Sequence, residues 1–596
     1  MTTIHDSMMN CSKFGLSTLR PLLVAVVALF AVGCSADVDS ELGYDIIPDH
    51  QKMEMRHLRF KGGKVLVFNS SASSDDKSVY DEREGKFFRT SLYHTDSLLS
   101  SNVSYGYLGV EHSDTFGMRA ASLASSIIFM NSVDEETGFG YKPIFDTLSL
   151  VLTINDYGVD TLTPVKYELY ELKKSLVGSV ADAADTAAYS NCWDKMTEVY
   201  NEDKPLFTFT FPDGEKTGPT TTTIDLTPVY GEDGKLSAQT WDFVRRLMLI
   251  PADYDTNPDW DGYTKDVDSL YSSEKKWLSR FHGVYIKPVL ESVDKSKQGA
   301  LYSFDLTASG LQLQGRNRNP KDPTLIQDTI GANYYFYDSS LDGYTDTYGN
   351  YYDGPADVKN VSVNSIKHDF TGSQLENVKF AAYDESGAKL PNSARDEVST
   401  CFVEGFAGIT TEIYFTDEFL MELKNASYID PENKEDKYRA IGINQCRLYL
   451  YLKGADYNWE KNIENAHLLT PLMDNCITRL GSYIGYSKLN CIADYDPEYE
   501  VAYSTELAYG GYLNRSRGCY ELDITGFMQR LYNYVNSLDV ESVEQFKDKY
   551  DETFTPRAIY LGPEAISPYT LLRTEIQGSS SELSPIHLEM TYTMVK

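Results

Sequence analysis

Apolar and polar residues alternate over many short stretches of this chain, and this pattern constrains the fold more than any other feature. The clearest stretch is residues 146–154, where every second residue is aliphatic: Leu148, Leu150, Leu152 and Ile154. A period of two residues predicts β-strands with one buried face. The 45 tyrosines, together with recurrent Val, Thr and Phe, suit the same pleated surfaces. We therefore predict a mostly β fold.

Further strands and two helices follow from the same reasoning. Alternation predicts strands over residues 165–170, 206–211, 222–227, 281–286 and 586–594. Residues 237–249 instead have helical spacing, with one apolar face formed by Trp241, Val244, Leu247 and Met248. Ser237 can cap the start of this helix, and residues 527–535 predict a second one.

The order of these segments occurs twice along the chain. Residues 146–152, 224–227 and 283–288 have counterparts of similar pattern at 444–450, 522–525 and 558–563. This recurrence indicates either an ancient duplication or two units that share a fold. Short strands separated by turn residues favour sandwiches over a parallel α/β sheet. We predict two tandem jelly-roll-like β-sandwich units, residues 58–330 and 331–596, each with a short crossing helix.

The N-terminal residues are typical of an exported protein. Arg20 precedes an apolar run over residues 21–32, which is too short to span a bilayer as a helix. Cys34 follows small residues at the expected cleavage point, which resembles the lipobox of bacterial lipoproteins. The resemblance implies removal of residues 1–33, lipid on the Cys34 sulfur and membrane attachment through that lipid. The alternative is an ordinary secreted protein cut near Gly33.

An acidic tether over residues 34–57 follows the signal segment. Residues 35–41 resemble the acidic export tract that sends some Bacteroidota lipoproteins to the outer face of the outer membrane. We therefore expect an outer-membrane protein at the cell surface, with the periplasmic leaflet as the alternative. The net charge of −34 argues against nucleic acid and anionic lipid as partners, because both would be repelled.

Several short motifs add a family resemblance. They lie, in order, at residues 95–97, 108–109, 114–117, 146–148, 281–286, 368–370, 404–408 and 588–592. With these motifs the chain resembles the Bacteroidota envelope lipoproteins catalogued as domain of unknown function 4270, over most of its mature length. The resemblance implies a lipid-anchored envelope protein and transfers no catalytic residue. The strand patterns also resemble jelly-roll domains of secreted adhesion proteins, which concerns the fold alone.

Acidic residues at alternate positions form one candidate metal site. Asp253, Asp255, Asn257 and Asp259 offer the oxygen ligands that calcium prefers. Pro258 stands where an EF-hand loop requires glycine, so the stretch departs from that motif. The alternative is a solvated acidic loop. We expect no cofactor and, apart from these calcium candidates, no metal.

Four tyrosines in an Asp- and Gly-rich stretch form a candidate contact surface: Tyr344, Tyr348, Tyr351 and Tyr352. Tyrosine side chains are rigid and amphipathic, which suits the binding of a glycan or a protein. The alternative is a connecting loop without such a role.

The sequence lacks the HExxH, GxSxG and CxxC motifs, so we expect no enzyme. Among the later cysteines, Cys476 could form a disulfide with Cys491 or Cys519, whereas Cys446 suits a buried thiol on a strand. The expected function is that of a non-catalytic binding or scaffold subunit in an envelope assembly, with envelope proteins as partners. A glycan-binding lipoprotein is the alternative, and a hydrolase with an unassigned carboxylate pair is a third hypothesis.

Overall fold

The computed structural model describes residues 53–595 apart from a set of internal segments. The segments outside the description are residues 70–78, 95–97, 102, 131–132, 134–137, 214–219, 255–269, 338–343, 346–350, 353–359, 379–395, 407, 429–436, 456–472, 474, 484–509, 565–568 and 581–585. Strands account for 47% of the structure and helices for 14%, which confirms the prediction of a mostly β fold.

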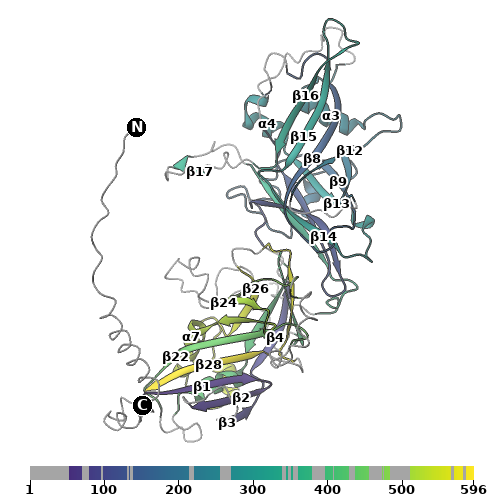
Figure 1. Cartoon of the computed structure of the whole chain (residues 1–596). Coiled ribbons are helices and arrows are strands. Elements are labelled where there is room, and N and C mark those ends of the chain that lie inside the picture. Colours follow the sequence, from purple (N-terminus) through teal and green to yellow (C-terminus); the bar gives the residue numbers. More distant parts are fainter. Residues whose placement is uncertain are drawn as a thin grey trace, which may run out of the picture.

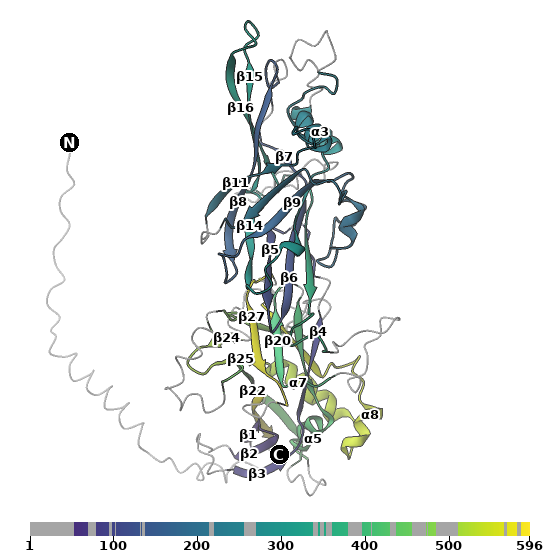
Figure 2. The same ribbon diagram turned by 90° about the vertical axis from the view of Figure 1, so that its right-hand side faces the viewer.

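The strands form two bodies that lie end to end (Figure 1). The terminal unit contains both ends of the described chain, in residues 53–94 and 396–595. The inserted unit comprises residues 98–378, which lie between those two parts in the sequence. Figure 2 shows the two bodies from the side, with the C-terminus at one end and the β15–β16 hairpin of the inserted unit at the other.

The terminal unit is built from a seven-stranded and a four-stranded antiparallel sheet. The first has the order β24 (Gly510–Asn514), β25 (Cys519–Asp523), β22 (Ala440–Tyr451), β28 (His587–Val595), β1 (Met53–Lys61), β2 (Lys64–Asn69) and β3 (Val79–Glu84). The second has the order β23 (Leu480–Tyr483), β26 (Ala558–Pro563), β21 (Ile409–Phe415) and β4 (Phe88–His94). The pair β20 (Thr400–Glu404) and β27 (Arg573–Gln577) completes the strands.

Thirteen strands form the sheet of the inserted unit. Its path runs through β12 (Thr227–Pro228), β10 (Phe207–Phe211), β9 (Val165–Glu171), β13 (Val284–Pro288), β6 (Gly117–Ser125), β5 (Tyr105–Ser113), β14 (Gly299–Asp305), β8 (Ile144–Tyr157), β15 (Gly310–Arg318), β16 (Ile326–Tyr335) and β7 (Ile128–Phe129). In addition, β11 (Thr221–Asp225) pairs with β8, and β19 (Ser362–Asp369) pairs with β6.

The helices are few and short. The inserted unit has α3 (Ala238–Leu247), α4 (Glu274–Arg280) and the 3-10 turns η3 (Lys195–Glu198), η4 (Leu270–Ser272) and η5 (Leu290–Ser292). The terminal unit has α5 (Asp417–Asn425), α7 (Thr525–Ser537), η11 (Val543–Gln545) and α8 (Phe546–Lys549). Both predicted helices are therefore present, as α3 and α7. In the described part of the chain, no helix has the length and apolar character needed to cross a bilayer.

The sheets are not divided at residue 330, where the sequence predicted a boundary between tandem units. Strands β1 to β4 belong to sheets that are otherwise formed by the last third of the chain. The strongest link is the ladder from Met53 opposite Val595 to Phe60 opposite Leu588, which joins β1 to β28. Both strands turn their apolar residues to the same core, so the ends of the chain close one sheet and the second body lies between them.

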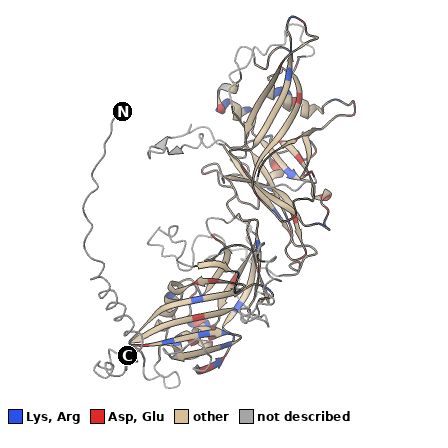
Figure 3. Cartoon of the chain, in the orientation of Figure 1, with Lys and Arg blue, Asp and Glu red and all other residues tan. Residues whose placement is uncertain are grey.

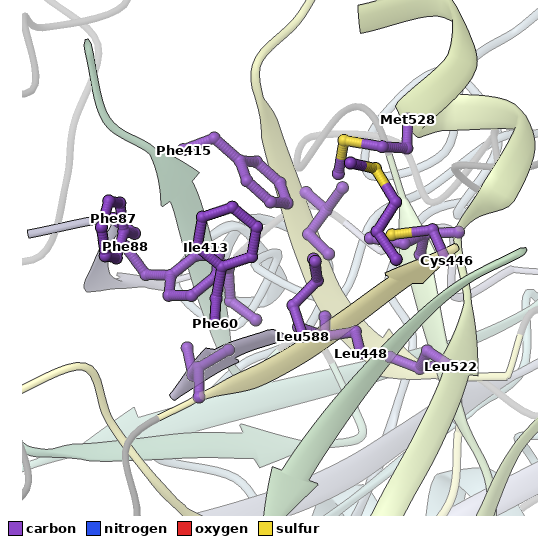
Figure 4. Packing of buried hydrophobic residues seen from close by; sticks show 14 of the residues in the cluster. Phe60, Phe87, Phe88, Ile413, Phe415, Cys446, Leu448, Leu522, Met528 and Leu588 are labelled. Atoms are coloured by element: carbon purple, nitrogen blue, oxygen red, sulfur yellow. The ribbon is translucent and has the colours of Figure 1, made fainter. Parts of the chain in front are cut away.

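The core of the terminal unit lies between the seven-stranded sheet on one side and the four-stranded sheet with helices α5 and α7 on the other. Figure 4 shows part of it, with side chains from β21 and α7 packed over β22 and β28. Phe60 contacts Phe87 and Phe419, with ring centroids 5.1 and 4.8 Å apart. Cys446 is fully buried in this core, close to the helix that carries Met528, as the sequence predicted. Burial of one phenylalanine or leucine side chain contributes about 1.5–3 kcal/mol. The many such side chains in this core therefore stabilise the sheet.

A three-stranded element recurs in both units with the same register. In the inserted unit the Leu226 N–H donates to the Leu148 carbonyl at 2.9 Å, beside the β8–β11 ladder. In the terminal unit the Ile524 N–H donates to the Cys446 carbonyl at 2.9 Å, beside the β22–β25 ladder. On the other edge, β15 pairs with β8 and β28 pairs with β22. Two of the three segment pairs of the predicted repeat, 146–152 with 444–450 and 224–227 with 522–525, thus share a pairing pattern.

Candidate binding groove on the inserted unit

A groove of about 600 Å³ lies on the inserted unit, where the starts of β8 and α3 meet β12 and the end of β15. Its lining is aromatic, aliphatic and charged, and consists of Lys142, Pro143, Ile144, Phe145, Asp146, Pro228, Tyr230, Leu236, Trp241, Tyr254 and Arg318. Helix α3 and the β15–β16 hairpin mark this end of the molecule in Figure 2, far from the chain end at Val595. A volume in this range is typical of small-ligand sites.

Helix α3 provides the aromatic wall. Ser237 caps the helix by accepting a hydrogen bond from the Thr240 N–H at 3.2 Å, which fixes where the helix begins. The buried face of α3 includes Phe243 and Leu247, whereas Trp241 remains partly exposed at the groove. The Trp241 ring lies 5.3 Å from the Tyr254 ring at 49°, so packing holds the indole in place.

Tyr230 forms the outer rim. It precedes a tight turn in which the Gly231 N–H donates to the Lys235 carbonyl at 2.8 Å, and it forms a β-bridge with Leu236. Gly234 has a φ of +76°, a conformation that favours glycine. The turn leaves Tyr230 56% exposed on the lining of the groove, where a ligand can cover it.

The lining of the groove also carries charged side chains. Asp146 is the one carboxylate among the described lining residues, and Arg316 binds it through two hydrogen bonds of 2.8 Å. Hydrogen bonding to this carboxylate raises the pKa of Arg316. Lys142 and Arg318 form no ion pair with the described residues, so they add positive charge to the lining in a chain whose net charge is −34. Figure 3 shows both signs of charge on the strands at this end of the inserted unit.

The groove has the chemistry of a binding site. Glycoside hydrolysis by a carboxylate pair needs two carboxyl groups about 5–9.5 Å apart, and the described lining offers Asp146 alone. Aromatic faces and fixed cations instead suit recognition of a ligand with an apolar face and an anionic group.

A buried cluster of charged side chains lies elsewhere, at the contact between the two units. Arg119 on β6 pairs with Glu111 at 2.9 Å and lies 3.8 Å from Glu404 on β20. Arg573 on β27 lies 3.2 Å from Glu404 and 3.5 Å from Glu111, and His368 is 3.7 Å from Glu404. All five side chains are buried. They lie within ion-pair distance of one another across the unit boundary, so this cluster links the two units.

The pKa shifts within the cluster agree with a link between the two units. Burial acts to raise the pKa of Glu111, but the Arg573 and Arg119 guanidinium groups outweigh it and hold the pKa below its ordinary value. Burial, reinforced by Arg573, lowers the pKa of Arg119. Arg119 also donates to the carbonyls of Leu571 at 2.9 Å and Gly405 at 3.4 Å, both in the terminal unit.

The candidate site residues from the sequence lie mostly beyond the described structure. Cys34, Asp255, Asn257 and Asp259 are outside it, and Asp253 lies exposed in a turn after α3. The part of the chain that the structure describes holds no group of three or more His, Cys, Asp or Glu residues placed to bind a metal. The lipid site and the calcium site therefore remain predictions.

The four candidate tyrosines are described in part. Tyr344 pairs with Tyr352, and Tyr351 with Thr345, in the short hairpin of β17 (Tyr344–Thr345) and β18 (Tyr351–Tyr352). Tyr348 lies outside the described residues. The backbone thus places three of these residues together, and their role as a contact surface remains a prediction.

The predicted disulfide between Cys476 and Cys519 is wrong, because both are buried thiols that are not joined to each other. Burial raises the pKa of the Cys476 thiol to about 11, which makes it inert at neutral pH. Cys192, Cys401 and Cys446 are likewise buried thiols outside any disulfide, and Cys491 lies outside the described residues.

Reasoning from the sequence missed the groove. The helical period assigned Trp241 to the buried face of α3, although its ring is partly exposed beside Tyr254. The available signal was the cluster of aromatic residues on either side of α3. Comparison with known proteins adds no assignment: no family model, no curated protein and no solved structure matches this chain.

Proposed function

We propose that this protein is a lipid-anchored binding or scaffold subunit of the bacterial envelope, which holds its inserted unit away from the membrane. The observation that carries the proposal is the position of the chain ends. The first described strand starts at Met53 opposite Val595, at the end of the molecule remote from the groove. A lipid on Cys34 would therefore attach the terminal unit, and the groove would face outward.

The length of the tether agrees with this arrangement. Residues 35–52 separate Cys34 from β1, and 18 residues span at most about 60 Å when fully extended. The net charge of −34 keeps the body away from anionic lipid and leaves the lipid as the point of attachment. The family resemblance of the sequence motifs supports the same location.

Membrane fractionation tests the anchor. The native protein is expected in the outer-membrane fraction, and the Cys34→Ala protein is expected in the soluble fraction of the envelope, because it lacks the lipid. Intact-mass measurement of the native protein should show acyl chains on a product that begins at Cys34. A Cys34→Ala protein that still sediments with membranes would overturn the proposal.

A glycan-binding lipoprotein is the second candidate function. The partly exposed rings of Tyr230 and Trp241 at the groove favour it, because aromatic side chains present flat faces to sugars.

A further inference from the structure

We infer that the groove on the inserted unit binds a short saccharide that carries a carboxylate. A sugar ring would lie against Trp241 and Tyr230, and its carboxylate would meet Arg318 and Lys142. This inference rests on the proposed function, because it names the ligand of the groove that the anchored protein presents.

The aromatic side chains of the lining account for the sugar ring. One face of a pyranose consists of C–H groups, and the electron-rich face of an aromatic ring attracts them. Tyr254 packs against the Trp241 ring at 5.3 Å, and the β-bridge to Leu236 fixes the backbone of Tyr230. Because the Trp241 ring is held before binding, little side-chain entropy is lost when a ligand covers it.

The cationic side chains of the lining account for the carboxylate. The backbone N–H of Arg318 donates to the Tyr141 carbonyl at 2.8 Å, which fixes the main chain at this residue. The Arg318 guanidinium donates to the Pro323 carbonyl at 2.8 Å, which holds the side chain. A guanidinium has five N–H donors, so this anchored side chain still has donors that can bind a carboxylate in a fork. Lys142 lies on the same lining and adds a second positive charge.

The charge of the whole chain limits the ligand further. A protein of net charge −34 repels a densely charged polyanion, so long acidic polymers are disfavoured. The groove compensates for this field locally, because Arg316 neutralises Asp146 and leaves two cations. A short saccharide with few carboxylates fits both conditions.

Calorimetry on the full-length lipoprotein in detergent tests the inference. The two probes are trigalacturonic acid and its uncharged counterpart galactotriose. We expect the acidic probe to bind at least tenfold more tightly, and the preference to weaken as ionic strength rises. Failure of both probes to bind, or equal affinity for the two, would overturn the ligand class.

Two variants locate the binding. Arg318→Gln should abolish the preference for the acidic probe, whereas Tyr230→Ala should weaken both probes severalfold. The Tyr230 ring is largely exposed, so its removal spares the core, and circular dichroism checks the fold. Phe554→Ala, at a ring that is 73% exposed on the terminal unit, is the matched aromatic control and should change nothing. Unchanged binding in both groove variants would place the saccharide elsewhere and contradict the inference.

Failure of the saccharide proposal can be distinguished from failure of the proposed function. If the native protein is membrane-anchored and loses a co-purifying envelope protein on Tyr230→Ala, but binds neither saccharide, the ligand class is wrong and the scaffold function stands. If the acidic saccharide binds but Cys34→Ala does not release the protein from membranes, the ligand class stands and the anchor proposal is wrong.

Discussion

At the contact between the units, the burial of a single charged residue determines how much stability its substitution removes. Glu404 lies between Arg119 and Arg573 with about 1% of its side chain exposed. Glu404→Gln would leave two buried guanidinium groups that share Glu111 alone. Breaking a buried ion pair in this way costs about 3–5 kcal/mol, so we expect a large loss in the free energy of unfolding by urea.

The exposed pair of Arg316 and Asp146 provides the comparison for Glu404→Gln. Its two side chains are 47% and 33% exposed, so water screens the interaction. Arg316→Gln should leave the unfolding midpoint nearly unchanged. Similar losses in both variants would show that burial of the cluster does not set its energy.

Glu589 on β28 gives a prediction about pH. Burial acts to raise the pKa of this carboxyl, but the hydrogen bond and charge of His587, followed by the charge of Arg59, outweigh it and lower the pKa from 4.5 to about 2. A lowered pKa means that the ionised form stabilises the folded state at pH values above the unfolded pKa. This contribution is lost as the pH falls from about 4.5 towards 2.

Urea unfolding at a series of pH values measures this contribution. Glu589→Gln should reduce stability at pH 7 and flatten the loss of stability between pH 4.5 and 2, because the variant has no carboxyl to protonate. Glu84, which is 80% exposed on the edge strand β3, is the control, and Glu84→Gln should leave the slope unchanged. A slope in Glu589→Gln equal to that of the unmodified protein would contradict the assignment.

Among the elements, helix α3 links local sequence to the candidate site. Ser237 caps the helix through the Thr240 N–H, and the next turn carries Trp241 into the groove. Ser237→Ala should cost about 1 kcal/mol of stability in thermal unfolding, because one N–H of the first turn loses its acceptor. Ser237→Asp can cap the helix and should retain most of that stability. Equal losses in both variants would rule out capping as the cause.

The elements also show what sequence patterns can reveal. The alternation over residues 146–154 identified β8, and helical spacing from Ser237 identified α3, because each pattern depends on neighbours in the chain. The partner of β1 could not be found in this way, because alternation shows that a segment is a strand but not which strand lies beside it. The groove was missed for the same reason, since its lining comes from four separate elements.

The whole molecule is organised as one unit inserted into another, and this arrangement explains how a long chain can place both ends together. The inserted unit also begins and ends with paired segments: Ser101 bridges Val363, and the Gln374 N–H donates to the Asp114 carbonyl at 3.0 Å. Such adjacent ends let a domain sit within a loop of another without disturbing its sheets.

Expression of separate fragments tests this organisation. Residues 98–378 contain all the strands of the thirteen-stranded sheet and should give a soluble β protein that unfolds cooperatively on heating. Residues 58–330 lack β19, the partner of β6. They contain most of β1 and all of β4, but not β28 and β21, the strands with which these two pair in the protein. The unpaired strands of this fragment should therefore cause aggregation. The tandem division would be supported instead if residues 58–330 folded and residues 98–378 aggregated. The inserted organisation makes the opposite prediction because β1 gains its buried neighbour only when the last strand of the chain is present.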